Sequence, residues 1–173
     1  LRELHAKRIF LVTGEKLFKL SGAANKILPY LQACSIKLFD DYCENPNIKD
    51  VVKGIDVYKK FQPDLVIAVG GGSAIDIAKS INIFSAQTDN YMDFVLKKQK
   101  IYSKGVPLLA IPTTSGTGSE STCFSVLYIE KLKYSLEHEY ILPDYTIIDP
   151  TLSYSLPPDV TASTGFDALS QGI

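Results

Sequence analysis

Residues 65–79, LVIAVGGGSAIDIAK, decide the fold class of this 173-residue chain. The first five are apolar and rich in β-branched side chains, which is typical of a strand buried in a parallel sheet. Apolar residues return after the three glycines, densely enough for a packed helix. The stretch therefore predicts a strand, a tight glycine turn and a helix in succession.

The glycine turn suits a phosphate group. Glycines let a backbone approach a ligand closely, and the free N–H groups at a helix N-terminus carry partial positive charge. The alternative is a tight turn that binds nothing, although three consecutive glycines are more than a turn needs. The turn is neither of two common phosphate motifs. Ile75 stands where GxGxxG requires its third glycine, and no Gly-Lys-Ser/Thr ends the run.

On both sides of this stretch, predicted strands alternate with predicted helices along the chain. Strands are expected at 8–13, 36–39, 65–69, 106–111 and 145–149, and helices at 15–31, 48–61, after residue 73 and over 161–173. Such alternation with short connections predicts a parallel sheet covered by helices. Segments 123–128 and 134–140 alternate weakly and predict a hairpin at the sheet edge. Because ligands bind beyond the carboxyl ends of such strands, Gly14, Asn45 and the glycine turn are expected on one rim.

A second loop, PTTSGTGSE at residues 112–120, follows the strand expected at 106–111. Its hydroxyl and N–H groups would emerge on the same rim, where they suit phosphate, ribose hydroxyls or an amide. Flexible filler is the alternative. We expect ligand contact here.

Composition excludes several other functions. Hydrophobic residues make up 46% and charged residues 21%, with a formal net charge of −1 and no basic run suited to nucleic acid. No apolar stretch has membrane-spanning length. Three widely spaced cysteines argue against a disulfide framework and favour a reducing, cytoplasmic setting. The chain does not begin with Met, and we expect a fragment or a trimmed chain.

Asp167 and Gln171 are four residues apart on the last expected helix. Their oxygens would share one helix face and could supply half of a metal site, while a solvated Asp–Gln pair is the plainer alternative. The spacing alone does not decide between the two.

Three motifs in this order resemble the iron-containing (group III) alcohol dehydrogenases. They are GGGS with Asp76 and Lys79, PTTSGTGSE at 112–120, and GFDAL at 165–169. Glycerol dehydrogenases and dehydroquinate synthases share the glycine turn but do not usually carry the PTTSGTGSE form. The resemblance implies a Rossmann-like dinucleotide-binding domain over residues 1–156. Residues 157–173 would begin an all-helical, metal-binding second domain.

The resemblance also implies roles for individual residues. Gly71, Gly72 and Ser73 would hold the cofactor pyrophosphate, and Asp76 would support that turn. Thr113, Thr114, Thr117 and Ser119 would line the path of the adenosine and the nicotinamide. Lys133 would lie near the cofactor ribose and Asn45 near the adenine side. Asp167 matches the first ligand of the metal, iron or zinc.

Two positions depart from the family pattern. Gly14 stands where NAD-preferring members place an aspartate that repels a 2′-phosphate, so we expect NADP, with Lys16 able to pair with that phosphate and Glu15 opposing it. Gln171 stands where the family has its next metal ligand, a histidine. A glutamine oxygen is a weaker ligand than imidazole for iron or zinc. In carrying Ser170-Gln171 at this position, the chain resembles the branch of the family that reduces phosphonoacetaldehyde.

The function expected from the resemblance is hydride transfer between NAD(P)H and a small alcohol/aldehyde pair, with the metal as a Lewis acid. No residue presents itself as the general acid. We also expect a homo-oligomer. Two alternatives are a glycerol dehydrogenase-like polyol enzyme and a non-catalytic nucleotide-binding module that has lost its metal site.

Overall fold

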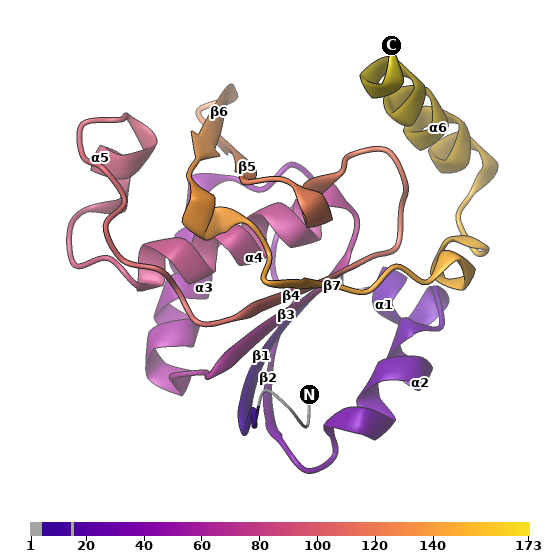
Figure 1. Cartoon of the computed structure of the whole chain (residues 1–173), viewed down its shortest axis with the longest axis horizontal. Coiled ribbons are helices and arrows are strands. Elements are labelled where there is room, and N and C mark those ends of the chain that lie inside the picture. Colours follow the sequence, from indigo (N-terminus) through magenta and orange to yellow (C-terminus); the bar gives the residue numbers. More distant parts are fainter. Residues whose placement is uncertain (1–4, 15) are drawn as a thin grey trace.

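A five-stranded parallel sheet forms the centre of the molecule (Figure 1), in a computed structural model that describes residues 5–14 and 16–173. Its order is β2-β1-β3-β4-β7. The strands are β1 (Arg8–Thr13), β2 (Ser35–Phe39), β3 (Leu65–Gly70), β4 (Leu108–Pro112) and β7 (Tyr145–Thr146). Every residue of β3 is buried, as its unbroken apolar run predicts for a central strand. The α/β class with a Rossmann-like parallel sheet is confirmed.

Helices cover both faces of the sheet (Figure 1). On one face, α3 (Ile48–Phe61) and α4 (Gly72–Ser85) pack against Phe10, Val12 and Val66. The opposite face packs Ile9 and Ile67 against a second group of segments. That group comprises α1 (Leu17–Leu20), α2 (Ala23–Ile27) and the 3-10 turns η1 (Leu28–Leu31) and η4 (Pro150–Ser153). Alternate side chains of one strand thus enter two separate cores.

The single helix expected over 15–31 is wrong in its continuity. Gly22 has φ of +77°, in the left-handed region, and separates α1 from α2. Pro29 then lies in η1 rather than in an α-helical last turn. The Ser21-Gly22 pair is the local signal for this break, because glycine adopts positive φ without a steric penalty.

The expected hairpin forms, but its expected place is wrong. Strands β5 (Phe124–Ile129) and β6 (Leu132–Glu137) pair antiparallel as a separate two-stranded sheet. Leu127 and Leu136 are buried in the same core as Ile77 and Ile81 of α4. The hairpin therefore packs on α4, where its apolar side chains are buried.

Four short elements, β7, α5, η2 and η3, complete this part of the fold. The strand expected over 145–149 is reduced to the two residues of β7. The polar stretch after α4 contains a short helix, α5 (Tyr91–Val95), capped by the Asn90 side chain. The 3-10 turns η2 (Ser119–Ser121) and η3 (Glu139–Ile141) flank the hairpin.

The last helix, α6 (Pro158–Gly172), projects from the sheet and has no buried residue (Figure 1). Gly165 does not interrupt it. Phe166 and Leu169 are 72% and 57% exposed. Among the described residues, none of the helices combines the length and the apolar character needed to span a bilayer.

Candidate functional site

The two glycine-containing loops meet at the carboxyl ends of β3 and β4. Gly70 pairs with Pro112 in the strand register, and the Thr113 N–H donates to the Gly70 carbonyl at 3.0 Å. Strand β1 lies on the other side of β3, so Gly14 follows a third strand end on the same rim. The shared rim expected from the strand order is present.

The glycines of the turn make room for threonines of the second loop. A Cβ added to Gly71 would lie 3.0 Å from Thr114 Oγ1, and one added to Gly72 would lie 2.9 Å from Thr117 Cγ2. A side chain at either position would require the facing threonine side chain to shift. The close contact between the two loops is thus one reason for these glycines. The close approach of a ligand, which the sequence suggested, is a second.

Thr113 presents a polar atom with no partner. The side chain is 3% exposed, and within the described part of the chain its Oγ1 makes no hydrogen bond. Such a hydroxyl costs about 1–3 kcal/mol unless something satisfies it. Its place between the two loops is consistent with a ligand that accepts or donates there.

Asp76, which the resemblance places in support of the glycine turn, hydrogen-bonds to the hairpin. Its Oδ2 accepts from the Val126 N–H at 3.2 Å. Burial raises the pKa of this carboxyl, opposed by that hydrogen bond, by the charge of Lys79 and by a bond to the Ser119 side chain. Asp76 therefore joins α4 to the hairpin and to the end of the second loop, residues 112–120, which we call the threonine loop.

Lys79 lies one helical turn after Asp76 and is 1% exposed. Its Nζ donates to the Thr122 and Phe124 carbonyls at 2.7 and 2.8 Å. Burial lowers the pKa of this ammonium to about 8, although Asp76 opposes the shift. No role was predicted for Lys79; a lysine among the alanines and isoleucines of residues 74–83 was the signal for one.

Asn45 and Ser73 are brought together from different elements. The Asn45 N–H donates to Ser73 Oγ at 3.4 Å, and Asn45 adopts φ of +58°. Asn47, two residues later, caps α3 in a reciprocal arrangement with Asp50. Lys133 lies on β6 opposite Tyr128 and is exposed.

A hollow of about 560 Å³ opens beside Gly14 at the ends of β1 and β2. Its polar lining consists of Thr13, Lys16, Lys19 and Asp40. The sequence had singled out Lys16 but not Lys19 or Asp40. Asp40 could not be found locally, because the end of β2 comes next to β1 only in the folded sheet. Glu15 lies outside the described residues.

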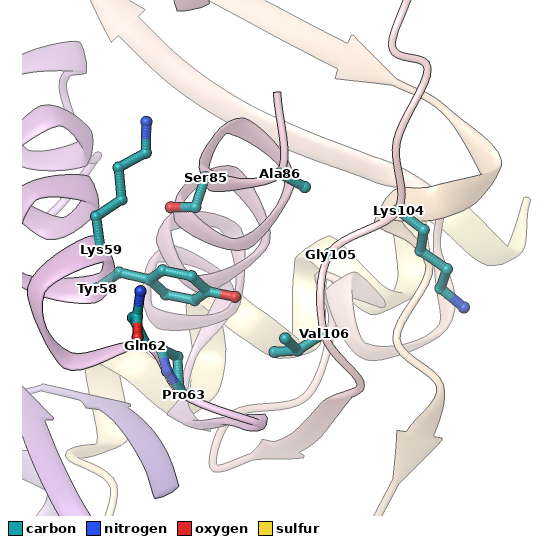
Figure 2. A pocket seen from close by; sticks show the side chains of 9 residues that line it. All are labelled: Tyr58, Lys59, Gln62, Pro63, Ser85, Ala86, Lys104, Gly105 and Val106. Atoms are coloured by element: carbon teal, nitrogen blue, oxygen red, sulfur yellow. The ribbon is translucent and has the colours of Figure 1, made fainter. Parts of the chain in front are cut away.

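A second hollow, of about 600 Å³, lies at the opposite, amino end of the sheet (Figure 2). Tyr58, Ser85 and Val106 are among its lining residues, and Tyr58 Oη donates to Asn82 at 3.0 Å. No carboxylate, histidine or cysteine is among the described residues that line it. It is therefore a poor candidate for catalysis.

Asp167 and Gln171 both reach the threonine loop from α6. Gln171 Nε2 donates to the Gly116 carbonyl at 2.8 Å and to Asp167 Oδ1 at 3.2 Å. The nitrogen of the amide thus faces the carboxylate, whereas a metal ligand would offer its oxygen. Asp167 fits as an oxygen ligand of a divalent cation, but Gln171 in this orientation does not. Within residues 5–14 and 16–173, three or more histidine, cysteine or acidic side chains nowhere gather as a metal site would require.

Relatives of known activity place the chain in a family. The family model for iron-containing alcohol dehydrogenases matches residues 1–150. The NADPH-dependent butanol dehydrogenase of Clostridium saccharobutylicum is 38% identical over an alignment of 182 positions, which covers 100% of this chain and 46% of that protein.

Solved structures agree with this assignment. The sulfoacetaldehyde reductase of Bifidobacterium kashiwanohense, solved with NAD+, is 35% identical with a TM-score of 0.90, and the match covers 98% of this chain and 46% of that one. The NADH-dependent butanol dehydrogenase A of Thermotoga maritima is 26% identical with a TM-score of 0.91, covering 98% and 43%. The chain therefore spans less than half the length of these relatives. It belongs to the iron-containing alcohol dehydrogenase family, as its three sequence motifs predicted.

Proposed function

We propose that the protein of which this chain forms the nucleotide-binding part transfers hydride between NAD(P)H and a small alcohol/aldehyde pair. Residues 1–156 would form the dinucleotide-binding domain and residues 157–173 the start of a helical domain. The observation that carries the proposal is the buried Thr113 hydroxyl, which has no hydrogen-bond partner among the described residues, on a rim built from two glycine-containing loops.

The rim residues would share the cofactor between them. Gly71, Gly72 and Ser73, at the N-terminus of α4, would bind the pyrophosphate through backbone N–H groups. The threonine loop would contact the rest of the dinucleotide through its polar side chains, Thr113, Thr114, Thr117 and Ser119. Asn45 would lie at the adenine side and Lys133 near a ribose. Asp76 would act indirectly, by holding Ser119 and the hairpin.

The proposed preference is for NADPH over NADH. Gly14 places no carboxylate at the end of β1, and Lys16 and Lys19 line the adjoining hollow. Two ammonium groups there would favour a 2′-phosphate, while Asp40 on the same hollow would oppose it. The butanol dehydrogenase of Clostridium saccharobutylicum is itself named as NADPH-dependent.

A divalent metal, iron or zinc, is also part of the proposal, with Asp167 as one oxygen ligand. When bound, such a cation polarises the substrate carbonyl as a Lewis acid. The protein's own groups would position the nicotinamide against the substrate carbon and exclude water. In aldehyde reduction, hydride passes from the nicotinamide to the carbonyl carbon, and a proton from a donor not yet assigned completes the alcohol.

The substrate proposed is a small aldehyde, and one with an acidic group is a specific candidate. The Ser170–Gln171 pair suggested phosphonoacetaldehyde, and a relative in the comparisons is named as a reductase of sulfoacetaldehyde. Both compounds join a two-carbon aldehyde to an anion.

The test is NADPH oxidation by the full-length protein with butanal, sulfoacetaldehyde and phosphonoacetaldehyde, with NADH as the comparison cofactor. We expect turnover, with a higher kcat/KM for NADPH. Tight NADPH binding without turnover of any aldehyde would favour the non-catalytic module, and turnover of glycerol alone would favour the polyol enzyme.

Thr113→Val separates cofactor binding from folding. Valine keeps the shape but removes the unpaired hydroxyl, so the cofactor-free protein should gain about 1 kcal/mol in the free energy of unfolding. The same change should weaken NADPH binding several-fold in a fluorescence titration. Unchanged NADPH affinity would contradict the role given to this hydroxyl.

A further inference from the structure

We infer that Gln171 is a positioning residue, whose side-chain amide latches the threonine loop to α6 and orients the Asp167 carboxylate, and that it is not a metal ligand. The inference rests on the proposed function only in taking this loop and Asp167 as parts of one site. The two hydrogen bonds that form this latch do not depend on the proposed function.

The partners of Gln171 fix which way its amide points. The Gly116 carbonyl and Asp167 Oδ1 can only accept hydrogen bonds, and both lie within hydrogen-bonding distance of Nε2, at 2.8 and 3.2 Å. The amide nitrogen has two protons, one for each acceptor. Reversing the amide would set its oxygen against two other oxygens and lose both bonds.

The latch joins segments 55 positions apart in the chain, and Gly116 makes that approach possible. Gly116 has φ of +115°, and a Cβ added there would lie 2.4 Å from the Thr164 carbonyl and 3.2 Å from Asp167 Oδ2. The loop can therefore touch α6 only where it has no side chain. Gln171 then reaches the carbonyl that this contact exposes.

The latch affects how Asp167 would meet a cation. One carboxylate oxygen, Oδ1, accepts from Gln171, while Oδ2 faces Gly116 and makes no hydrogen bond among the described residues. For Gln171 to turn its oxygen toward the Asp167 carboxylate, where its nitrogen now lies, the amide would have to rotate and release Gly116. Ligation by Gln171 of a cation on that side of Asp167 and attachment of the loop therefore exclude one another.

The functional consequence is that loop and helix move as one body. The loop carries Thr113, Thr114 and Thr117, and α6 carries Asp167. A single amide thus fixes the proposed cofactor loop relative to the proposed metal ligand. That geometry sets the distance between the nicotinamide and the polarised carbonyl.

Two substitutions separate the latch from ligation. Gln171→Lys keeps a donor that can reach the two acceptors but removes every oxygen. Gln171→Glu keeps oxygens that could bind a metal but removes the donor. Gln171→Leu removes both, and Ser163→Ala, on an exposed part of α6, is the matched control.

The experiment measures hydrogen exchange of residues 113–122 by mass spectrometry in the full-length protein, first stripped of metal. We expect Gln171→Leu and Gln171→Glu to speed exchange about fivefold, the loss of roughly one net hydrogen bond, while Gln171→Lys and Ser163→Ala exchange as the wild type does. Adding Zn²⁺ to the wild type should leave this exchange unchanged.

Either of two results overturns the inference. One is wild-type exchange in both Gln171→Leu and Gln171→Glu, and the other is faster loop exchange in the wild type when Zn²⁺ is added. Neither measurement needs cofactor or turnover. A protein that keeps the expected exchange pattern but oxidises no NADPH would therefore refute the proposed function and leave the latch intact.

Discussion

Gly116 shows how much one residue without a side chain decides at this site. Its φ of +115° and the 2.4 Å distance from an added Cβ to the Thr164 carbonyl leave no room for alanine. Flexible filler was the alternative that the sequence left open for this loop. In the structure Gly116 instead allows a fixed contact between the loop and α6.

Replacing this glycine should destabilise the contact. Gly116→Ala is expected to lower the free energy of unfolding by about 1–3 kcal/mol, because backbone strain adds to a clash with a backbone carbonyl. Urea unfolding followed by circular dichroism measures the loss. Gly165→Ala is the control, since a Cβ there meets nothing within 4 Å and lies in a helix interior. It should be neutral or stabilising, and an equal loss in both variants would contradict this account.

At the scale of the elements, helix α3 begins with a complete capping box. The Asn47 side chain accepts from the backbone N–H groups of Lys49 and Asp50 at 2.8 and 3.1 Å, and Asp50 Oδ2 accepts from the Asn47 N–H at 3.2 Å. This capping box was readable in the sequence as Asn followed three residues later by an acid. It also holds the segment from which Asn45 reaches Ser73 on the rim.

Removing the cap should cost stability without changing the fold. Asn47→Ala is expected to lower the free energy of unfolding by about 1 kcal/mol, because two helix N–H groups lose their acceptor. Chemical denaturation of the variant measures this. Lys49→Ala changes an exposed residue of the same turn and should stay within about 0.5 kcal/mol of the wild type. A larger loss from Lys49→Ala than from Asn47→Ala would show that the Asn47 cap does not stabilise this turn.

At the scale of the whole molecule, the buried ammonium group of Lys79 makes the stability of the fold depend on pH. Lys79 joins α4 to the carbonyls before and within β5, and its pKa falls from 10.5 to about 8 on burial. Below pH 8 the lysine is protonated in both the folded and the unfolded chain, so folding bears the full cost of burying the charge. Between about 8 and 10.5 the unfolded chain binds more protons, so the free energy of unfolding rises with pH.

Lys79→Met should abolish that rise. The difference in unfolding free energy between wild type and variant should move in favour of the wild type from pH 7 to pH 11, by on the order of 3 kcal/mol at most. Comparing the two proteins cancels the tyrosines that also titrate in this range, such as Tyr58, whose pKa burial raises to about 12. A difference independent of pH would show that Lys79 keeps its ordinary pKa in the fold.

Local sequence was informative where each residue's neighbours along the chain set its conformation. The apolar run of β3, the turn before α4 and the alternation of strands with helices were predicted, because period and turn chemistry are local. The Asn47 cap of α3 was also readable locally but was not predicted. The common rim of Gly14, the glycine turn and the threonine loop followed from strand order, because parallel strands end on the same side. The break at Gly22 was signalled locally by Ser21-Gly22 but was overlooked.

The α/β class, the family and the residues of the rim could be predicted from the chain alone, because they depend on patterns and motifs that are contiguous in it. Folding was needed to show where the hairpin packs, that Asp76 and Lys79 bind it, and which end of the Gln171 amide faces Asp167. Each of these depends on an acceptor or donor far away in sequence: the Val126 N–H for Asp76, the Phe124 carbonyl for Lys79 and the Gly116 carbonyl for Gln171. The type of a side chain determines which hydrogen bonds it can make, but the partner that folding brings within hydrogen-bonding distance determines which of them it does make.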